Sequence, residues 1–331
     1  MPAPAPALWT LTDGAAGNRR QAEALAAALA GTARRDLVLA PRAPWRWLAP
    51  RRVPGAARCF DPALAGGPAA APALAIGCGR QAALATRLLR ARGTRTIQLL
   101  DPRLSPRHWD LLIVPEHDRL RGENVLTVRG SLHPIDDAWL AAARATWAPR
   151  LAGLPAPRTG LLLGGPIAQV PWTPADLDAL LDGLAAEARA SGASLLVTGS
   201  RRTPAWAVQA VHARLGSLPG LRWFGAHDGE NPYPGILACC DRLVVGADSV
   251  NLLSEAAATH ATLHAAFASR AAGRHADFLA ALRGSGRLDG LDAAPLRELP
   301  RAAAWVRERL GLGDPPSPTA TPVETVPIRR A

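Results

Sequence analysis

The stretch GADSVNLLSEA, residues 246–256, combines residue types that can bind a nucleotide. Asp248 is placed to cap a helix, and Ser249 would expose its N–H and hydroxyl groups in the first turn. Ser254 and Glu255 follow one to two turns later, where a glutamate can accept hydrogen bonds from both hydroxyls of a ribose. The alternative is an ordinary helix cap followed by a solvent-exposed glutamate.

Two further loops have the chemistry of a diphosphate site. The SRRTP loop has Ser200, Arg201 and Arg202 just before an expected helix, where guanidinium groups and the helix dipole attract an anion together. The LLGGP loop has Gly164 and Gly165, whose backbone N–H groups can approach a phosphate closely. The alternatives are a solvated basic loop and a tight strand-to-helix turn.

The first half of the chain has two loops with candidate catalytic groups. DGAAGN begins at Asp13 and lacks the G-x-G-x-x-G spacing, so neither a dinucleotide site nor an NAD-dependent enzyme is supported. IVPEHD places Glu116, His117 and Asp118 after a strand. A histidine beside carboxylates can act as a general base near neutral pH, and a structural or surface role for His117 stays equally open.

The segment PRAPWRWLAPRR interleaves tryptophan and arginine. Tryptophan favours a membrane interface and arginine attracts anionic head groups, each basic residue contributing about 1 kcal/mol near such a surface. The alternative is tryptophan packed under a loop with solvated arginines. Nucleic-acid binding is not expected, because no helix-turn-helix, RRM or KH signature is present. The residues concerned are Arg42, Trp45, Arg46, Trp47, Arg51 and Arg52.

The composition is that of a globular protein. The chain has 331 residues, 48% of them apolar and 20% charged, which is long enough for two domains. No window holds eighteen uninterrupted apolar residues, so no transmembrane helix is expected. The start, MPAPAPALW, lacks the charged and apolar regions of a secretory signal, so a cytoplasmic location is expected, with peripheral attachment at the inner face of the membrane.

The positive charge is unevenly distributed. All 38 basic residues are arginine, which indicates a GC-rich coding bias and a bacterial source. Residues 1–155 carry 21 arginines against 11 acidic residues, whereas residues 156–331 carry 17 against 16. A basic half beside a nearly neutral half suggests that one domain meets an anionic partner.

Apolar runs alternate with helical patterns in two blocks, which predicts two parallel-sheet α/β domains. We expect domains over residues 1–152 and 153–313, a Pro- and Gly-rich linker near 151–157, and a disordered tail over 314–331. Expected strands are 7–11, 37–39, 73–76, 96–100, 111–114, 160–163, 194–198, 221–224, 243–245 and 262–266. Expected helices are 19–30, 81–91, 136–148, 174–190, 205–215, 232–240 and 250–259, with Asn231 capping the sixth.

The cysteine pattern argues against a disulfide framework or a zinc site. No C-x-x-C pair is present, and buried thiols are the expectation. No metal and no cofactor is expected. The four cysteines are Cys59, Cys78, Cys239 and Cys240.

The loops together resemble the mitochondrial-fission "elongated mitochondria" family over roughly residues 8–310. WTLTDGAAGNRRQAEALAAAL, LLDPR, IVPEHD, GSLH, LLGGP, SRRTP and GENPYPGILACCDRLVVGADSVNLLSEAAAT occur here in the order typical of that family. Two departures are visible: Gly246 stands where the family often has threonine, and His260, Ala261 and Thr262 replace its usual Gly-basic-Pro.

The resemblance implies a GT-B-like fold, with two Rossmann-like domains facing a cleft, and a metal-independent glycosyltransferase. It implies a nucleoside-diphosphate sugar as donor. The basic first half and the Trp–Arg segment suggest a cell-envelope or lipid-linked acceptor, and the expected catalytic residues are Asp13, His117 and Asp118, with Asp13 or His117 as the base. The alternative is a non-catalytic, membrane-associated adaptor on the same scaffold. On the acceptor side of the cleft, the resemblance implies Asp13, Gly14, Gly17, Asn18 and Gln21. For the nucleotide-sugar it implies Gly164, Gly165, Ser200, Arg201, Arg202, Asn231, Pro232, Tyr233, Asp248, Ser249, Ser254 and Glu255.

Overall fold

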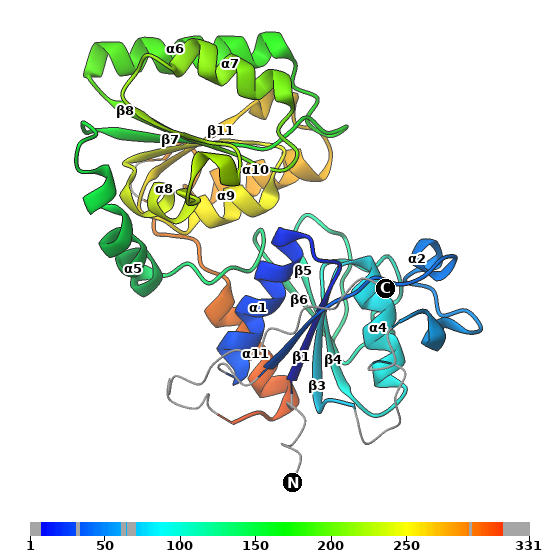
Figure 1. Cartoon of the computed structure of the whole chain (residues 1–331). Helices are drawn as coiled ribbons and strands as arrows, with labels where there is room; N and C mark the ends of the chain where they lie inside the picture. The colour runs from blue at the N-terminus through cyan, green and yellow to red at the C-terminus, as the bar shows by residue number, and fades with distance from the viewer. Residues whose placement is uncertain (1–7, 31–33, 61–63, 65–70, 291–292, 314–331) are drawn as a thin grey trace. The chain divides into compact units, whose positions relative to one another are not determined.

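The computed structural model describes residues 8–30, 34–60, 64, 71–290 and 293–313. They form two compact units, one from the chain up to Pro134 together with the chain from Glu298, the other from Ile135 to Arg297. Each unit contains a parallel sheet with helices on both faces (Figure 1). The expected fold class, two Rossmann-like α/β domains, is therefore confirmed.

The sheet of the first unit has the strand order β2-β1-β3-β4-β5-β6, and all its pairings are parallel. The register sets Leu8 opposite Leu74 and Thr12 opposite Cys78, so β1 and β3 end at the same level. The strands are β1 (Leu8–Thr12), β2 (Arg34–Val38), β3 (Leu74–Cys78), β4 (Arg95–Leu99), β5 (Leu111–Pro115) and β6 (Val125–Val128). The helices are α1 (Ala16–Ala30), α2 (Trp45–Leu48), α4 (Arg80–Arg90) and α11 (Leu299–Leu310).

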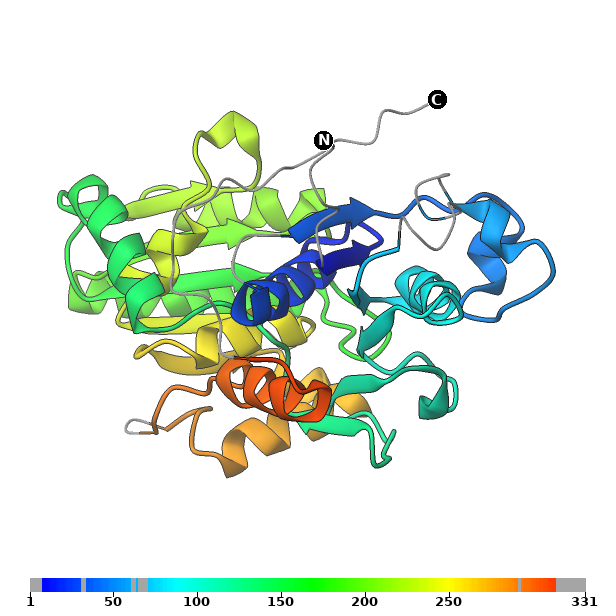
Figure 2. The ribbon, with the colours of Figure 1, turned by 90° about the horizontal axis from the view of Figure 1, so that it is seen from below.

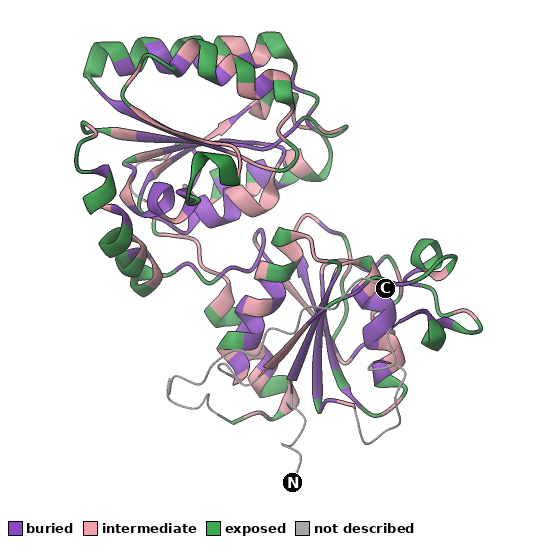
Figure 3. Ribbon diagram, in the orientation of Figure 1, coloured by how far each residue is buried: buried purple, intermediate pink, exposed green. Residues whose placement is uncertain are grey.

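The pleat of the first sheet separates two hydrophobic cores. Leu8 and Ile76 pack with α1 and α11 on one face, whereas Trp9 and Ala75 pack with α4 on the other. Figure 2 shows α1 and α11 lying side by side, although they are far apart in the sequence. Strands β1, β3 and β5 are buried along their whole length, as is usual for parallel strands covered on both faces (Figure 3).

The sheet of the second unit has the order β11-β10-β7-β8-β9, again parallel throughout. Helices α6 and α7 cover one face, and α8, α9 and α10 cover the other (Figure 1). The strands are β7 (Arg158–Leu163), β8 (Ser194–Gly199), β9 (Gly220–Trp223), β10 (Arg242–Gly246) and β11 (Thr262–Ala266). The helices are α5 (Asp137–Trp147), α6 (Pro174–Ser191), α7 (Ala205–Leu215), α8 (Tyr233–Cys239), α9 (Val250–Ala257) and α10 (Arg274–Gly284).

Local sequence chemistry fixes the ends of α6. Thr173 and Asp176 form a reciprocal capping box, Pro174 occupies the first turn, and Gly192 ends the helix with a φ of 71°. That left-handed conformation suits glycine, which carries no Cβ. The helix therefore begins and ends where its sequence specifies.

The domain boundaries differ from those expected. Helix α5, expected in the first domain, packs on α8 in the second unit, where Trp147 contacts Gly235. Helix α11 returns to the first unit because Ala302, Ala303 and Val306 complete the core beside α1. The expected linker near 151–157 lies inside the second unit, and residues 314–331 lie outside the described residues.

The structure places the cysteines as thiols in the interior. Cys59, Cys78 and Cys240 are buried, and Cys239 is half-buried. Burial raises the pKa of all four thiols, which keeps them protonated at neutral pH. Among the described helices, none is both long enough and apolar enough to span a bilayer.

Candidate functional site

The strand order of the second sheet marks one edge as the place for a ligand. The chain runs from β7 outward to β8 and β9, then crosses back to β10 on the other side of β7. The loops after β7 and β10 therefore diverge to helices on opposite faces (Figure 1). The carboxyl ends of these two strands form a topological switch point, the place where the ligand crevice of an open α/β sheet is expected. Gly164 and Gly165 follow β7, and Asp248 follows β10.

Asp248 links the loops at this crevice. Its side chain is fully buried, and its Oδ2 accepts hydrogen bonds from the Gly165 N–H at 3.0 Å and from Arg202 Nη2 at 2.8 Å. Arg202 also donates through Nη1 to the Gly165 carbonyl at 3.3 Å. The carboxylate was expected to cap α9, but Ser249 performs that role, its Oγ accepting from the Leu252 N–H at 3.3 Å.

Three glycines make room for this arrangement. A Cβ at Gly164 would overlap the Asp248 carboxylate, and one at Gly246 would lie 2.5 Å from its Oδ1. A Cβ at Gly165 would overlap the backbone carbonyl of Arg202. Gly246, one of the departures from the family pattern, is therefore required by the packing of the neighbouring aspartate.

Burial dominates the electrostatics of Asp248. It raises the pKa of the carboxyl group, and the nearby Arg202 charge offsets part of this effect. Oδ1 is buried and has no hydrogen-bond partner among the described residues. His275 of α10 hydrogen-bonds the Asp248 backbone, and burial lowers the pKa of its imidazole.

The SRRTP loop is held in a compact turn. The Ser200 N–H donates to Thr203 Oγ1 at 2.8 Å, and the Arg202 N–H donates to Ser200 Oγ at 3.1 Å. Thr203 Oγ1 in turn donates to the Gly164 carbonyl at 2.7 Å. The Arg201 side chain is exposed and makes no hydrogen bond or ion pair with any residue that the structure describes.

A second polar contact joins α8 to α9. The Tyr233 hydroxyl donates to Oε2 of Glu255, and both side chains are buried. Asn231 Oδ1 accepts from the Tyr233 N–H at 3.0 Å, and the buried Pro232 is the residue before the helix. The helix begins at Tyr233, one residue later than expected, so Pro232 and not Asn231 occupies the cap position. Glu255 is buried, so the alternative of a solvent-exposed glutamate is wrong.

The Ser254 side chain forms a hydrogen bond within its own helix, α9. Its Oγ donates to the Val250 carbonyl at 2.7 Å, and the residue is buried. Glu255 lies six residues after Ser249, which corresponds to about 9 Å along an α-helix. The two polar groupings, around Asp248 and around Glu255, are thus separated by less than two turns of α9.

The first sheet has its own crevice, between β1 and β3, because the chain crosses from β2 back to β3 on the other side of β1. Asp13 follows β1, and its Oδ1 accepts from the Ala15 N–H and from Asn18 Nδ2, both at 3.0 Å. Gly79 follows β3, and a Cβ there would lie 2.8 Å from Asn18 Nδ2. Gly14 adopts a φ of 79° in the same turn.

The other expected residues of this first crevice lie within α1. Gln21 is buried, and its Nε2 approaches the Gly17 carbonyl at 3.4 Å. Gly17 and Gln21 therefore contact each other within the helix that follows Asp13.

The structure does not bring His117 beside Asp13. His117 and Asp118 follow β5, and β3 and β4 lie between β5 and β1. Three strand spacings correspond to about 14 Å. Asp118 is buried, its carbonyl accepts from Arg121 Nη1 at 2.5 Å, and neighbouring Glu116 pairs with Arg129 at 3.2 Å.

The Trp–Arg segment is only partly solvated. Trp45 is half-buried and donates through Nε1 to the Pro54 carbonyl at 3.2 Å, as the alternative of packed tryptophan requires. Trp47 and Leu48 are 61% and 40% exposed, and the Arg46 guanidinium lies 5.2 Å from the Trp47 ring centre. The arginines of the segment, Arg42, Arg46, Arg51 and Arg52, are all exposed.

Sequence reasoning missed Thr203 and His275. Thr203 had a local signal, because a hydroxyl three residues after Ser200 can close a turn onto the Ser200 N–H. His275 had none, since it reaches Asp248 from a helix that begins far along the chain. Gly79 had a weak signal in its position directly after a buried strand.

The chain matches the family model described as Mitochondrial fission ELM1 over residues 16–310. "Mitochondrial fission protein ELM1" of Arabidopsis thaliana is 29% identical over 275 residues, which cover 72% of this chain and 64% of that protein. The chain thus spans less than two thirds of that relative's length.

Solved structures with a similar fold share little sequence. A complex of S. aureus MnaA with UDP has a TM-score of 0.50 at 10% identity and covers 95% of this chain and 100% of the other. Acinetobacter baumannii MurG has a TM-score of 0.48 at 13% identity and covers 92% and 91%. The first of these likenesses supports the GT-B-like fold and nothing more. The match of the family model to most of the sequence, over loops that form the Asp248 site, shows that the chain belongs to the mitochondrial fission ELM1 family.

Proposed function

We propose that the chain binds a nucleoside-diphosphate sugar at the carboxyl edge of the second sheet and transfers the sugar to an acceptor. The observation that carries this proposal is the crevice between β7 and β10, where Asp248 fixes Arg202 against the Gly164–Gly165 turn. Such a fixed guanidinium beside a helix N-terminus can stabilise the negative charge of a departing diphosphate.

Each group in the crevice receives a role. Arg202 is a positioned cation, and Arg201 is the mobile cation that closes on the diphosphate. Ser249 and the first turn of α9 present N–H groups to the phosphates. Glu255 binds the ribose hydroxyls, with its carboxylate oriented by Tyr233. Asn231 and Pro232 lie at the base end.

In the first unit, we assign the general base to Asp13. Its position at the crevice between β1 and β3 favours it over His117, which lies three strands away. Asp13 would remove a proton from an acceptor hydroxyl, an effect typically worth a rate factor of 10² to 10⁴. His117 and Asp118 then belong to the acceptor-binding surface. The proposed acceptor is a cell-envelope or lipid-linked molecule.

Binding is tested by calorimetric titration of the full chain with UDP, GDP, ADP, CMP and dTDP sugars. UDP comes first because the S. aureus MnaA structure of similar fold was solved with it. A nucleotide at a hundred times its Kd stabilises the fold by about 2.7 kcal/mol, which a thermal melt also detects. Arg201→Ala should weaken binding at least tenfold, whereas Arg189→Ala, an exposed arginine on α6, should not. Absence of binding by every nucleotide overturns the proposal.

A second candidate function is a membrane-associated adaptor that uses the fold without catalysis. The exposure of Trp47 and Leu48 beside arginines favours it. The change Asp13→Asn separates the two functions, because it keeps an acceptor for the Ala15 N–H and removes the base. An enzyme loses at least about a hundredfold in rate, whereas an adaptor keeps its activity. Asp101→Asn is the matched control, since Asp101 caps a similar loop after β4, with its Oδ1 accepting from the Arg103 N–H at 2.7 Å.

A further inference from the structure

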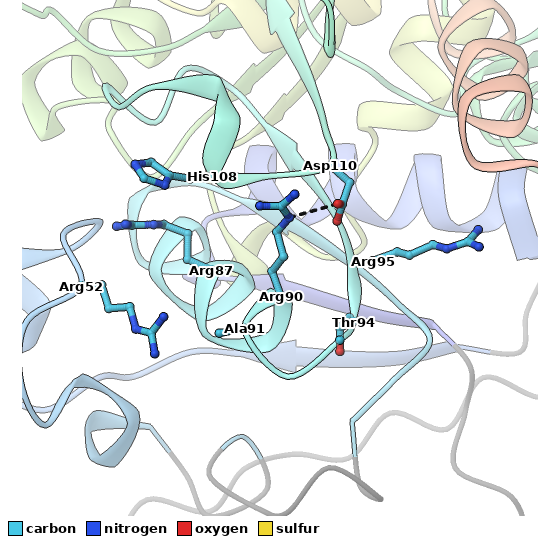
Figure 4. A pocket seen from close by; sticks show the side chains of 9 residues that line it. Arg52, Arg87, Arg90, Ala91, Thr94, Arg95, His108 and Asp110 are labelled. Carbon is cyan, nitrogen blue, oxygen red and sulfur yellow. Dashed lines mark hydrogen bonds and ion pairs between the residues drawn. The ribbon is translucent and has the colours of Figure 1, made fainter.

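A basic hollow lies at the end of the first sheet opposite the Asp13 crevice. Thr94 and Arg95 stand at the start of β4, and Asp110 directly precedes β5. Because parallel strands all start at one edge and finish at the other, this hollow is remote from Asp13 and Gly79. It has a volume of about 420 Å³, which lies in the range of small-molecule sites (Figure 4). Its charged or titratable lining consists of Arg52, Arg87, Arg90, Arg95, His108 and Asp110.

Among the residues that the structure describes, only one of the four arginines has an acidic partner. Arg90 Nε donates to Asp110 Oδ1 at 3.0 Å, the ion pair drawn in Figure 4. Asp110 is also engaged on its other oxygen, which accepts from the N–H and Oγ1 of Thr96 at 2.7 and 3.0 Å. One carboxylate against four guanidinium groups leaves a net charge of +3 in the hollow with His108 neutral.

Two of the three remaining arginines donate to backbone carbonyls, which are neutral. Arg87 donates to the Pro50 carbonyl at 2.6 Å, and Arg95 donates to the Leu310 carbonyl at 2.6 Å. Arg52 has no hydrogen bond or ion pair to any residue within the described ranges. Backbone carbonyls thus orient Arg87 and Arg95, and no acidic residue within the described ranges pairs with Arg52, Arg87 or Arg95.

The titration behaviour of the lining agrees with a positive potential. Burial lowers the pKa of Arg87, and the charge of Arg52 lowers it further. Burial likewise lowers the pKa of His108, and Arg87, Arg107 and Arg90 add to the effect. Guanidinium groups gathered this way repel one another, and an anion in the hollow would remove that cost.

We propose that this hollow is a second anion site, which binds the phosphate group of a phosphorylated ligand. Guanidinium forks match the oxygens of a phosphate, and arginine is the residue typical of such sites. A second hollow of about 580 Å³ shares Arg90, Arg95 and Asp110 and adds Arg107, Arg309 and Glu123. Its four arginines outnumber its two carboxylates, so the basic surface extends beyond one phosphate. The phosphate can come from a lipid headgroup or from a soluble molecule.

The test uses the full chain and two probes, inorganic pyrophosphate and vesicles of phosphatidylglycerol. Calorimetry of the wild type with pyrophosphate should give two binding events, one in this hollow and one in the proposed nucleotide crevice. Arg52→Ala, and the double change Arg52→Ala with Arg95→Ala, should weaken one event at least tenfold. Arg201→Ala should weaken the other, so failure of either site is separately visible.

The matched control is Arg58→Ala, which removes an exposed arginine of the same unit outside the hollow. Sedimentation with phosphatidylglycerol and phosphatidylcholine vesicles then identifies the source of the phosphate. Loss of phosphatidylglycerol binding in the Arg52 variants, beyond that in the Arg58 variant, supports a lipid headgroup. Loss of pyrophosphate binding alone supports a soluble ligand. If the Arg52 variants match the Arg58 variant with both probes, the proposal is wrong.

Discussion

Arg202 donates to the buried Oδ2 of Asp248 across 2.8 Å and so joins the loop after β8 to the loop after β10. Its guanidinium is therefore already paired with a carboxylate, whereas Arg201 beside it is not paired with any described residue. The two adjacent arginines therefore have different roles: Arg202 fixes the geometry of the crevice, and Arg201 is available to an incoming anion.

The change Asp248→Asn should weaken nucleotide binding about tenfold or more, since hydrogen bonds to charged groups contribute about 1.5–3 kcal/mol. The asparagine still accepts from the Gly165 N–H but leaves Arg202 without its anion. Calorimetric titration with the nucleotide that binds the wild type measures the effect. Asp277→Asn on α10 is the control, and an equal loss there would contradict a specific role for Asp248.

The same substitution should alter how stability depends on pH. Burial raises the native pKa of Asp248 above its unfolded value of about 3.9. The native state then holds this proton more tightly, so the group stabilises the fold below about pH 3.9 and loses that contribution as pH rises through the native pKa. In urea unfolding between pH 4 and 8, the free energy of unfolding of the wild type should rise relative to that of Asp248→Asn as pH falls. A difference that is constant or of opposite sign rules this out.

The change Gly164→Ala should destabilise the fold by about 1–3 kcal/mol, the usual cost of forcing an extra methyl group into a packed site. Its Cβ would overlap the Asp248 carboxylate, which is fixed by two hydrogen bonds. Gly183→Ala is the contrasting control, because that glycine is exposed within α6 and its Cβ meets nothing within 4 Å. The Gly183→Ala change should stabilise the fold by about 0.5–1 kcal/mol, because alanine has the higher helix propensity. Denaturant unfolding compares the two, and equal effects would contradict the packing argument.

Tyr233→Phe and Glu255→Gln test the ribose end. Phenylalanine removes the hydroxyl that orients Glu255, so nucleotide affinity should fall about three- to tenfold, as expected for one lost hydrogen bond. Glu255→Gln should cost more, because it removes the proposed acceptor itself. Both affinities come from the same titration. Equal affinities for nucleotides with ribose and deoxyribose in the wild type would place the ribose elsewhere.

Local chemistry predicted most strands and helices, because buried parallel strands are apolar runs and helix caps have fixed residue types. The strand Val125–Val128 was not predicted, since it lies at the sheet edge and three of its four residues are only half-buried. Helices Arg274–Gly284 and Leu299–Leu310 were also missed. Periodicity identifies the apolar face of a helix but not its partner, so the assignment of Asp137–Trp147 to the first domain was wrong.

The candidate site, like the fold, could be predicted only in part from the sequence. The loops could be found from the sequence because glycine, arginine and acidic residues follow apolar strands there. The buried position of the Asp248 side chain could not be predicted, because it depends on the space left by Gly164, which is distant in sequence, as well as by Gly246. The local sequence pattern favours a capping role for an aspartate before a helix. The ion pair with Arg202 forms only when the chain folds, so the local pattern does not reveal it.

Arg297 binds Asp137 with both ends of its guanidinium, at 2.7 and 2.9 Å, and His260 adds a contact at 2.8 Å. Asp137 and Arg297 lie near the two ends of the second unit, which runs from Ile135 to Arg297. Hydrogen bonds from Arg297 and His260 hold the pKa of Asp137 well below its usual range. A depressed pKa stabilises the fold above about pH 3.9 and loses that effect as pH falls. Arg297→Ala should therefore lower the Tm at pH 7 and converge with wild type in acid, unlike Arg189→Ala. Parallel Tm curves for wild type and Arg297→Ala down to pH 3 would contradict this clamp.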